Sequence, residues 1–130
     1  MIIKLMLESE KPLYQQLKEN ILQSLAKGEL KEGEMLPSVR QLSASLSINM
    51  HTVNKAYNQL AGEGFLTMHK GKGAIINAKE KYEAGEKEKG GIKESLSVIS
   101  AEAKCRSLGR EEFIKMCGES FDQFEKESER

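Results

Sequence analysis

Apolar residues recur at three- and four-residue steps near the start of the chain, which is the spacing of one face of a helix. The pattern predicts a helix over residues 12–27, where Pro12 suits the first turn and Gly28 can end the helix. The predicted buried stripe of this helix consists of Tyr14, Leu17, Ile21 and Leu25.

Two further helical patterns follow, separated by only a few residues. Ser38 and Gln41 have the spacing of a capping box at the start of a short helix that ends near Leu46. Asn49 can cap a third helix, which runs to about Gly62. Two helices with so short a turn are a candidate helix-turn-helix, although an ordinary helical hairpin has the same spacing. Their predicted buried residues are Val39, Leu42 and Leu46 in the first, and Val53, Ala56, Tyr57 and Leu60 in the second.

The next pattern is that of a β-hairpin with a basic tip. Residues 65–69 and 73–77 are strand-like and flank Lys-Gly-Lys at residues 70–72. A loop that cradles nucleotide phosphates would need Gly-Lys-Ser or Gly-Lys-Thr and a helix after it, whereas here Ala74 and a strand pattern follow. We therefore expect a wing, whose glycines permit a tight turn and a close approach of backbone N–H groups to phosphate.

The last third of the chain contains two helical patterns with apolar stripes, over residues 94–109 and 110–127. Three phenylalanines on one stripe of so small a segment need burial. A partner subunit would provide it, and so would packing back onto the preceding domain. The residues expected at a dimer interface are Leu96, Ile99, Ala103, Phe113, Cys117, Phe121 and Phe124.

A charged segment with three glycines, residues 80–91, separates the two halves and has the composition of a flexible linker. We therefore expect a helix that is broken or frayed before Ile92. The predicted organisation is a domain over residues 1–77 that contains the candidate helix-turn-helix and the wing, a linker or frayed helix start over 78–91 and a helical tail over 92–130.

The charges of the chain balance overall but not locally. The chain has 20 basic and 20 acidic side chains, whereas residues 38–77 contain four bases and a single acid, Glu63. A locally basic surface can bind a polyanion even on a neutral protein. The four bases are Arg40, Lys55, Lys70 and Lys72.

Several classes of function are disfavoured by what the sequence lacks. No run of 18 apolar residues predicts a membrane span, and the N-terminus becomes acidic too soon for a secretory signal, so we expect a cytoplasmic protein. No acid–base pair, activated nucleophile or metal-ligand spacing stands out, so we expect no enzyme, metal site or cofactor. Cys105 and Cys117 are expected to stay reduced.

Residues 10–77 together resemble the winged-helix domain of the GntR family of bacterial transcription regulators. The shared motifs are Pro-Ser-x-Arg-x-Leu from Pro37, Asn-x-x-Thr-Val-x-x-Ala-Tyr from Asn49, Leu-x-x-Glu-Gly from Leu60 and Gly-x-Gly from Gly71. The short tail is similar to that of the YtrA-type members. The resemblance implies a mostly α fold with a small β-hairpin, in which an N-terminal winged helix-turn-helix precedes a two-helix C-terminal dimerisation tail.

The resemblance also implies a repressor that binds an inverted-repeat operator in double-stranded DNA as a homodimer. Arg40 would then contact a base, with a phosphate contact or an internal ion pair as the alternative. The Tyr57 hydroxyl would reach a phosphate, with a purely core role as the alternative, and Thr52 could equally serve the helix N-terminus. The expected DNA-binding residues are Ser38, Arg40, Asn49, Met50, His51, Thr52, Asn54, Lys55, Tyr57, His69, Lys70, Gly71, Lys72 and Gly73.

Two other interpretations stay open at the level of sequence. A winged helix can serve protein–protein contact without sequence-specific DNA binding, although the acid-poor face of the third helix favours DNA. A small-molecule effector could occupy a pocket at the dimer interface, since the tail alone is too short to enclose one.

Overall fold

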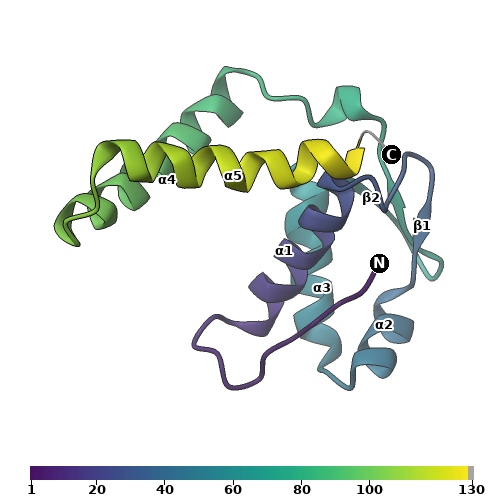
Figure 1. Ribbon diagram of the computed structural model, residues 1–130. Helices are drawn as coiled ribbons and strands as arrows, with labels where there is room; N and C mark the ends of the chain where they lie inside the picture. Colours follow the sequence, from purple (N-terminus) through teal and green to yellow (C-terminus); the bar gives the residue numbers. More distant parts are fainter. Residues whose placement is uncertain (129–130) are drawn as a thin grey trace. The chain divides into compact units, whose positions relative to one another are not determined.

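Three helices and a small antiparallel sheet form the first part of the chain (Figure 1). The computed structural model describes residues 1–128, with side chains placed as far as Glu125, and contains two compact units, residues 1–82 and the part from Glu83 onward. The first unit is a winged helix, and the described chain is mostly helical, as the resemblance implied. Its elements are α1 (Leu13–Ala26), β1 (Met35–Leu36), α2 (Val39–Leu46), α3 (Met50–Gly62), β2 (Leu66–His69) and β3 (Gly73–Ile76).

The predicted helix starts are confirmed in atomic detail. The Ser38 hydroxyl accepts from the Gln41 N–H at 3.1 Å while the Gln41 side chain accepts from the Ser38 N–H at 3.0 Å, which is a complete capping box. The Asn49 side chain accepts from the His51 N–H at 2.7 Å and caps α3. Both helices of the helix-turn-helix therefore begin at side chains that satisfy their own free N–H groups.

The core lies where the three helices meet the sheet. Leu17 and Ile21 of α1 and the whole predicted stripe of α3 are 0–1% exposed. Tyr14, Leu25, Val39 and Leu46 are only half-buried, at the edge of this core. The apolar periodicity thus predicts correctly which face of each helix points inward. The other members of the core are Leu30, Leu36, Leu42, Leu66, Ala74 and Ile76.

The sheet has three strands, in the order β1-β3-β2, rather than the two of a simple hairpin. β2 pairs with β3 from Leu66↔Ile76 to His69↔Gly73. β1 pairs with the other edge of β3, with Leu36 opposite Ala74. The sequence did not predict this first strand, because a segment of two residues is too short to show any alternation of apolar and polar positions.

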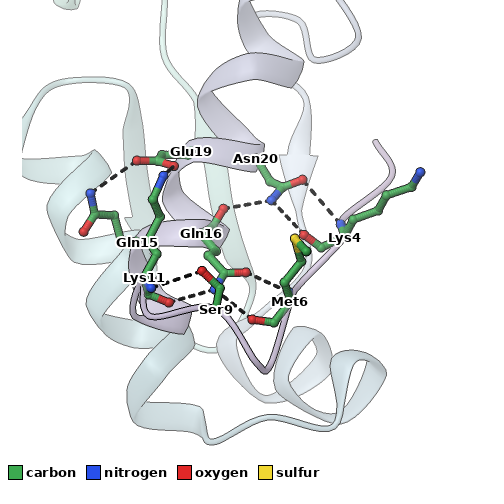
Figure 2. Close-up of polar contacts among 8 residues, drawn as sticks. All are labelled: Lys4, Met6, Ser9, Lys11, Gln15, Gln16, Glu19 and Asn20. Atoms are coloured by element: carbon green, nitrogen blue, oxygen red, sulfur yellow. Dashed lines mark hydrogen bonds and ion pairs between the residues drawn. The ribbon is translucent and has the colours of Figure 1, made fainter. Parts of the chain in front are cut away.

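An N-terminal arm, residues 1–11, is fastened to α1 by amide side chains (Figure 2). Gln16 is 8% exposed, accepts from the Met6 N–H at 2.8 Å and donates to the Met6 and Lys11 carbonyls at 3.1 and 2.7 Å. Asn20, one helical turn later, accepts from the Lys4 N–H at 3.4 Å and donates to the Lys4 carbonyl at 3.2 Å. The arm also packs Ile3 and Leu5 against the core.

The first unit ends later than the sequence indicated. The rings of Phe65 and Tyr82 lie 4.9 Å apart, and a short 3-10 helix, Lys79–Lys81, lies against Gly64. These contacts hold residues 78–82 in the unit, so its boundary at residue 77 is corrected to Tyr82.

Two long helices form the second unit, α4 (Glu86–Cys105) and α5 (Arg110–Ser128). The expectation that the first is broken before Ile92 is wrong, because α4 runs unbroken through Gly90 and Gly91. The Gly85 N–H donates to the Glu88 side chain at 2.9 Å and helps to start the helix. Over the described residues, no helix is long and apolar enough to cross a membrane.

Candidate nucleic-acid interface

A groove of about 400 Å³ lies where the start of α2, the start of α3 and the β2–β3 wing converge. It brings together residues that lie more than thirty positions apart in the sequence, and eight of its ten lining residues were expected at one site. The groove is lined by Ser38, Val39, Arg40, Met50, Asn54, Met68, His69, Lys70, Gly71 and Gly73.

The three walls of this groove are fixed to one short segment, residues 36–38. The buried Tyr57 of α3 donates its hydroxyl hydrogen to the Pro37 carbonyl at 2.7 Å. Gly73 of the wing has φ +108° and approaches so closely that a Cβ there would collide with the Leu36 carbonyl oxygen. Helix α3 and the wing are thereby held against the residues that start α2, and Arg40 follows in the first turn of that helix.

The tip of the wing is a tight turn that presents two lysines. The Lys72 N–H donates to the His69 carbonyl at 2.9 Å. Gly71, with φ +77°, occupies the third position of this turn, where a type II turn requires a positive φ. Lys70 and Lys72 on either side of it are exposed.

The charge on this part of the molecule is not cancelled internally. Among the described residues, none of the four bases of residues 38–77 forms an ion pair, so the internal ion pair considered for Arg40 is not present. The single acid of that region, Glu63, is engaged by Lys18 at 2.6 Å. A set of bases without acidic partners is the arrangement expected of a surface that meets phosphates.

Other predicted site residues lie at the edge of the groove or are engaged elsewhere. Asn49 is exposed, but its side-chain oxygen caps α3, and the backbone N–H of Ser38 is taken by Gln41. His51 is exposed on the first turn of α3 and does not line the groove, and Thr52 is half-buried. The capping groups at the starts of α2 and α3 are therefore already bonded within the protein.

Tyr57 differs most from the role expected of it. Tyr57 is fully buried with its hydroxyl bonded to Pro37, so it cannot reach a phosphate and the core alternative holds. Burial also raises the pKa of the Tyr57 hydroxyl. Lys55 is exposed but lies away from the groove lining, with its ammonium nitrogen 3.9 Å from the centre of the Tyr14 ring.

Two groove residues were not anticipated from the sequence. Val39 had been assigned to the buried stripe of α2, but it is half-buried and lines the groove. Met68 shares a face of β2 with the buried Leu66, and this two-residue alternation was the signal that could have placed it. Both supply apolar surface between the polar side chains of the groove.

The residues expected at a dimer interface differ in their exposure. Leu96, Ile99 and Phe121 are 48%, 51% and 66% exposed. Ala103 is buried, Phe113 and Phe124 are half-buried, and Cys117 is exposed. Ile92, Val98, Ile114 and Met116, which had not been singled out, are also more than half exposed.

Comparison with known proteins agrees with this geometry. The family model of gntR-family bacterial regulatory proteins matches residues 13–76. The HTH-type transcriptional repressor YtrA of Bacillus subtilis is 35% identical over 95 residues, which are 73% of this chain and 73% of that protein. The chain spans a smaller share of other relatives, 14% and 60% of the next two. The matched relatives are transcriptional regulators rather than enzymes.

Solved structures support the same assignment. YtrA from Sulfolobus acidocaldarius, a GntR-family transcription factor, is 40% identical and superposes with a TM-score of 0.63 over 81% of this chain and 99% of that one. A transcriptional antiterminator from Listeria monocytogenes is 25% identical and superposes with a TM-score of 0.87 over 95% and 92% of the two chains. The chain therefore belongs to the GntR family of bacterial regulatory proteins, among its YtrA-type members with a short tail.

Proposed function

We propose that this regulator is a repressor that binds an inverted-repeat operator in double-stranded DNA as a homodimer. The observation that supports the DNA surface is the groove between α2, α3 and the wing, around which four bases have no acidic partner among the described residues. Affinity would come mainly from phosphates, and specificity from base edges in the major groove.

The side chains around the groove divide between these two tasks. Arg40 has the paired donors that match the O6 and N7 atoms of guanine, and Asn54 has the donor and acceptor that match adenine. His51 is the further candidate for a base contact at the exposed start of α3. Lys70 and Lys72, at the tip of the wing, would meet the backbone or the minor groove.

The exposed apolar side chains of the second unit support a homodimer. Leu96, Ile99 and Phe121 expose large apolar surfaces that a second copy would cover. A two-fold dimer presents two copies of the groove, which fits two half-sites related by an inverted repeat. The repressor assignment follows the relative YtrA of Bacillus subtilis, which is a transcriptional repressor.

The test begins with selection of genomic DNA fragments by the purified protein at two salt concentrations. We expect one inverted repeat to be enriched at both. Lys72→Ala should then weaken binding to all sequences alike and reduce the slope of log K against log salt by about 1. Weak binding that salt abolishes, with no enriched sequence, would contradict the proposal and favour the protein–protein alternative.

A further inference from the structure

Of the four bases in residues 38–77, only Lys55 is described in contact with an aromatic ring over the residues that the structure covers. Its ammonium nitrogen lies 3.9 Å from the centre of the Tyr14 ring, so α1 and α3 meet at this point through a cation–π contact. One turn further along both helices, the Lys18 ammonium meets Glu63 at 2.6 Å and Gln59 at 3.5 Å. Both lysines therefore connect α1 with α3. Lys55 does so by contacting a neutral ring, and Lys18 does so by pairing with a carboxylate.

This difference determines which charge is available to a ligand. The nearby acid of α1, Glu19, is engaged by Lys11 at 2.8 Å and by Gln15 at 3.3 Å, and Glu63 is engaged by Lys18. Within the part of the chain that the structure describes, Lys55 therefore has no carboxylate partner. The Tyr14 ring orients the ammonium without neutralising it, whereas an ion pair would do both.

We infer that Tyr14 is a positioning residue that holds the Lys55 ammonium ready to contact a DNA phosphate beside the groove. The inference rests on the proposed function. A lysine has a long flexible side chain and three N–H donors, and the ring occupies only one side of the ammonium. Orienting the side chain before DNA arrives lowers the entropy that binding must remove.

A double-mutant cycle on the selected operator tests this role, with Tyr14→Leu, Lys55→Met and the pair together. Lys55→Met should reduce the salt slope by about 1. Tyr14→Leu should weaken binding roughly two- to five-fold, the size of an exposed cation–π contact. The double variant should bind no more weakly than Lys55→Met alone, because Tyr14 acts only through Lys55.

Tyr14→Phe is the matched control, since it keeps the ring and removes the hydroxyl. It should bind like the wild type, and proton NMR should show the Lys55 side-chain methylene signals shifted by the ring in the wild type and in Tyr14→Phe but not in Tyr14→Leu. Additive losses in the cycle, or an equal loss in Tyr14→Phe and Tyr14→Leu, would overturn the inference while leaving the proposed function intact. A wild-type protein without any preferred DNA sequence would overturn both.

Discussion

At the scale of single residues, the shape of the groove depends on Tyr57 and Gly73, which hold its walls together. Tyr57 is completely buried, yet its hydroxyl connects α3 to the carbonyl of Pro37, where α2 begins. Gly73 allows the wing to approach the same segment. Both residues belong to motifs that resemble the family, and both were expected to contact DNA. Tyr57 thus supports the groove from the core without lining it, whereas Gly73 both lines the groove and permits the close approach that shapes it.

Tyr57 should make the stability of the protein fall in alkaline solution. Its pKa is raised in the folded state from the usual 10.0, so above about pH 10 the unfolded chain binds fewer protons than the folded one. The contribution of Tyr57 to the free energy of unfolding is therefore fully present below that pH, and it decreases as the pH rises further. Urea unfolding between pH 8 and 11 measures this, with Tyr57→Phe as the control, which should show a shallower decrease. Equal slopes in the two proteins would refute the assignment.

Gly73 and Gly71 form a matched pair for testing the wing. Gly73→Ala should cost about 2–4 kcal/mol, because a Cβ would strike the backbone of Leu36 and Pro37 at a positive φ. Gly71→Ala should cost only about 1–2 kcal/mol, since its Cβ would meet nothing within 4 Å and only the positive φ is unfavourable. Thermal unfolding of both variants decides, and equal losses would show that the wing does not need the close approach.

At the scale of elements, prediction from the sequence succeeded where periodicity and caps were strong. The capping residues Ser38 and Asn49 and the apolar stripe of α3 are all found where the pattern placed them. Strand β1 was not predicted, because two residues are too few to show the alternation of apolar and polar positions that marks a strand. Helix α4 starts earlier than expected because the two glycines in it do not break it. A Cβ at Gly90 or Gly91 would meet nothing within 4 Å, and the cost of a glycine in a helix is about 0.5–1 kcal/mol of backbone entropy relative to alanine.

The contacts that fasten one element to another could not be predicted in this way. The bond from Tyr57 to Pro37 and the contact between Lys55 and Tyr14 join residues far apart in the sequence, and no spacing rule relates them. The N-terminal arm is a similar case. Nothing in the sequence of the arm shows that the side-chain amide of Gln16 bonds to the backbone of Met6.

Gln16 should therefore control whether the arm stays on α1. Gln16→Ala removes three nearly buried hydrogen bonds and should lower the free energy of unfolding by about 1–3 kcal/mol. Hydrogen exchange at the Met6 amide should accelerate at the same time. Gln15→Ala is the control. The hydrogen bond described for the Gln15 side chain goes to the Glu19 side chain and not to the arm. Unchanged exchange at Met6 in Gln16→Ala would mean that the arm is held by other contacts.

At the scale of the whole molecule, the proposed function requires two copies of the groove. The apolar stripe of the second unit would join them through residues such as Leu96 and Phe121, which are exposed in the single chain. Each copy alone would meet only half of an inverted repeat. Dimerisation through this unit would thus determine affinity for the complete operator.

Phe121→Ser should weaken the dimer. Losing a large buried aromatic contact at an interface costs about 2 kcal/mol or more, which is roughly a 30-fold rise in the dimer dissociation constant. Sedimentation equilibrium measures this directly. Val98→Ser is the control, because Val98 is equally exposed at 69% but lies off the predicted stripe. A monomeric wild-type protein, or the same loss in both variants, would argue against this interface.

The most direct test of the central claim is the affinity of wild type and Arg40→Ala for the selected operator and for a scrambled duplex, measured at the same salt concentration. We predict that Arg40→Ala weakens operator binding by about 1–3 kcal/mol, changes binding to the scrambled duplex much less, and relaxes the preference at one base position of each half-site. An Arg40→Ala protein that distinguishes the two duplexes as well as the wild type would contradict the assignment of this groove as the surface that recognises the operator.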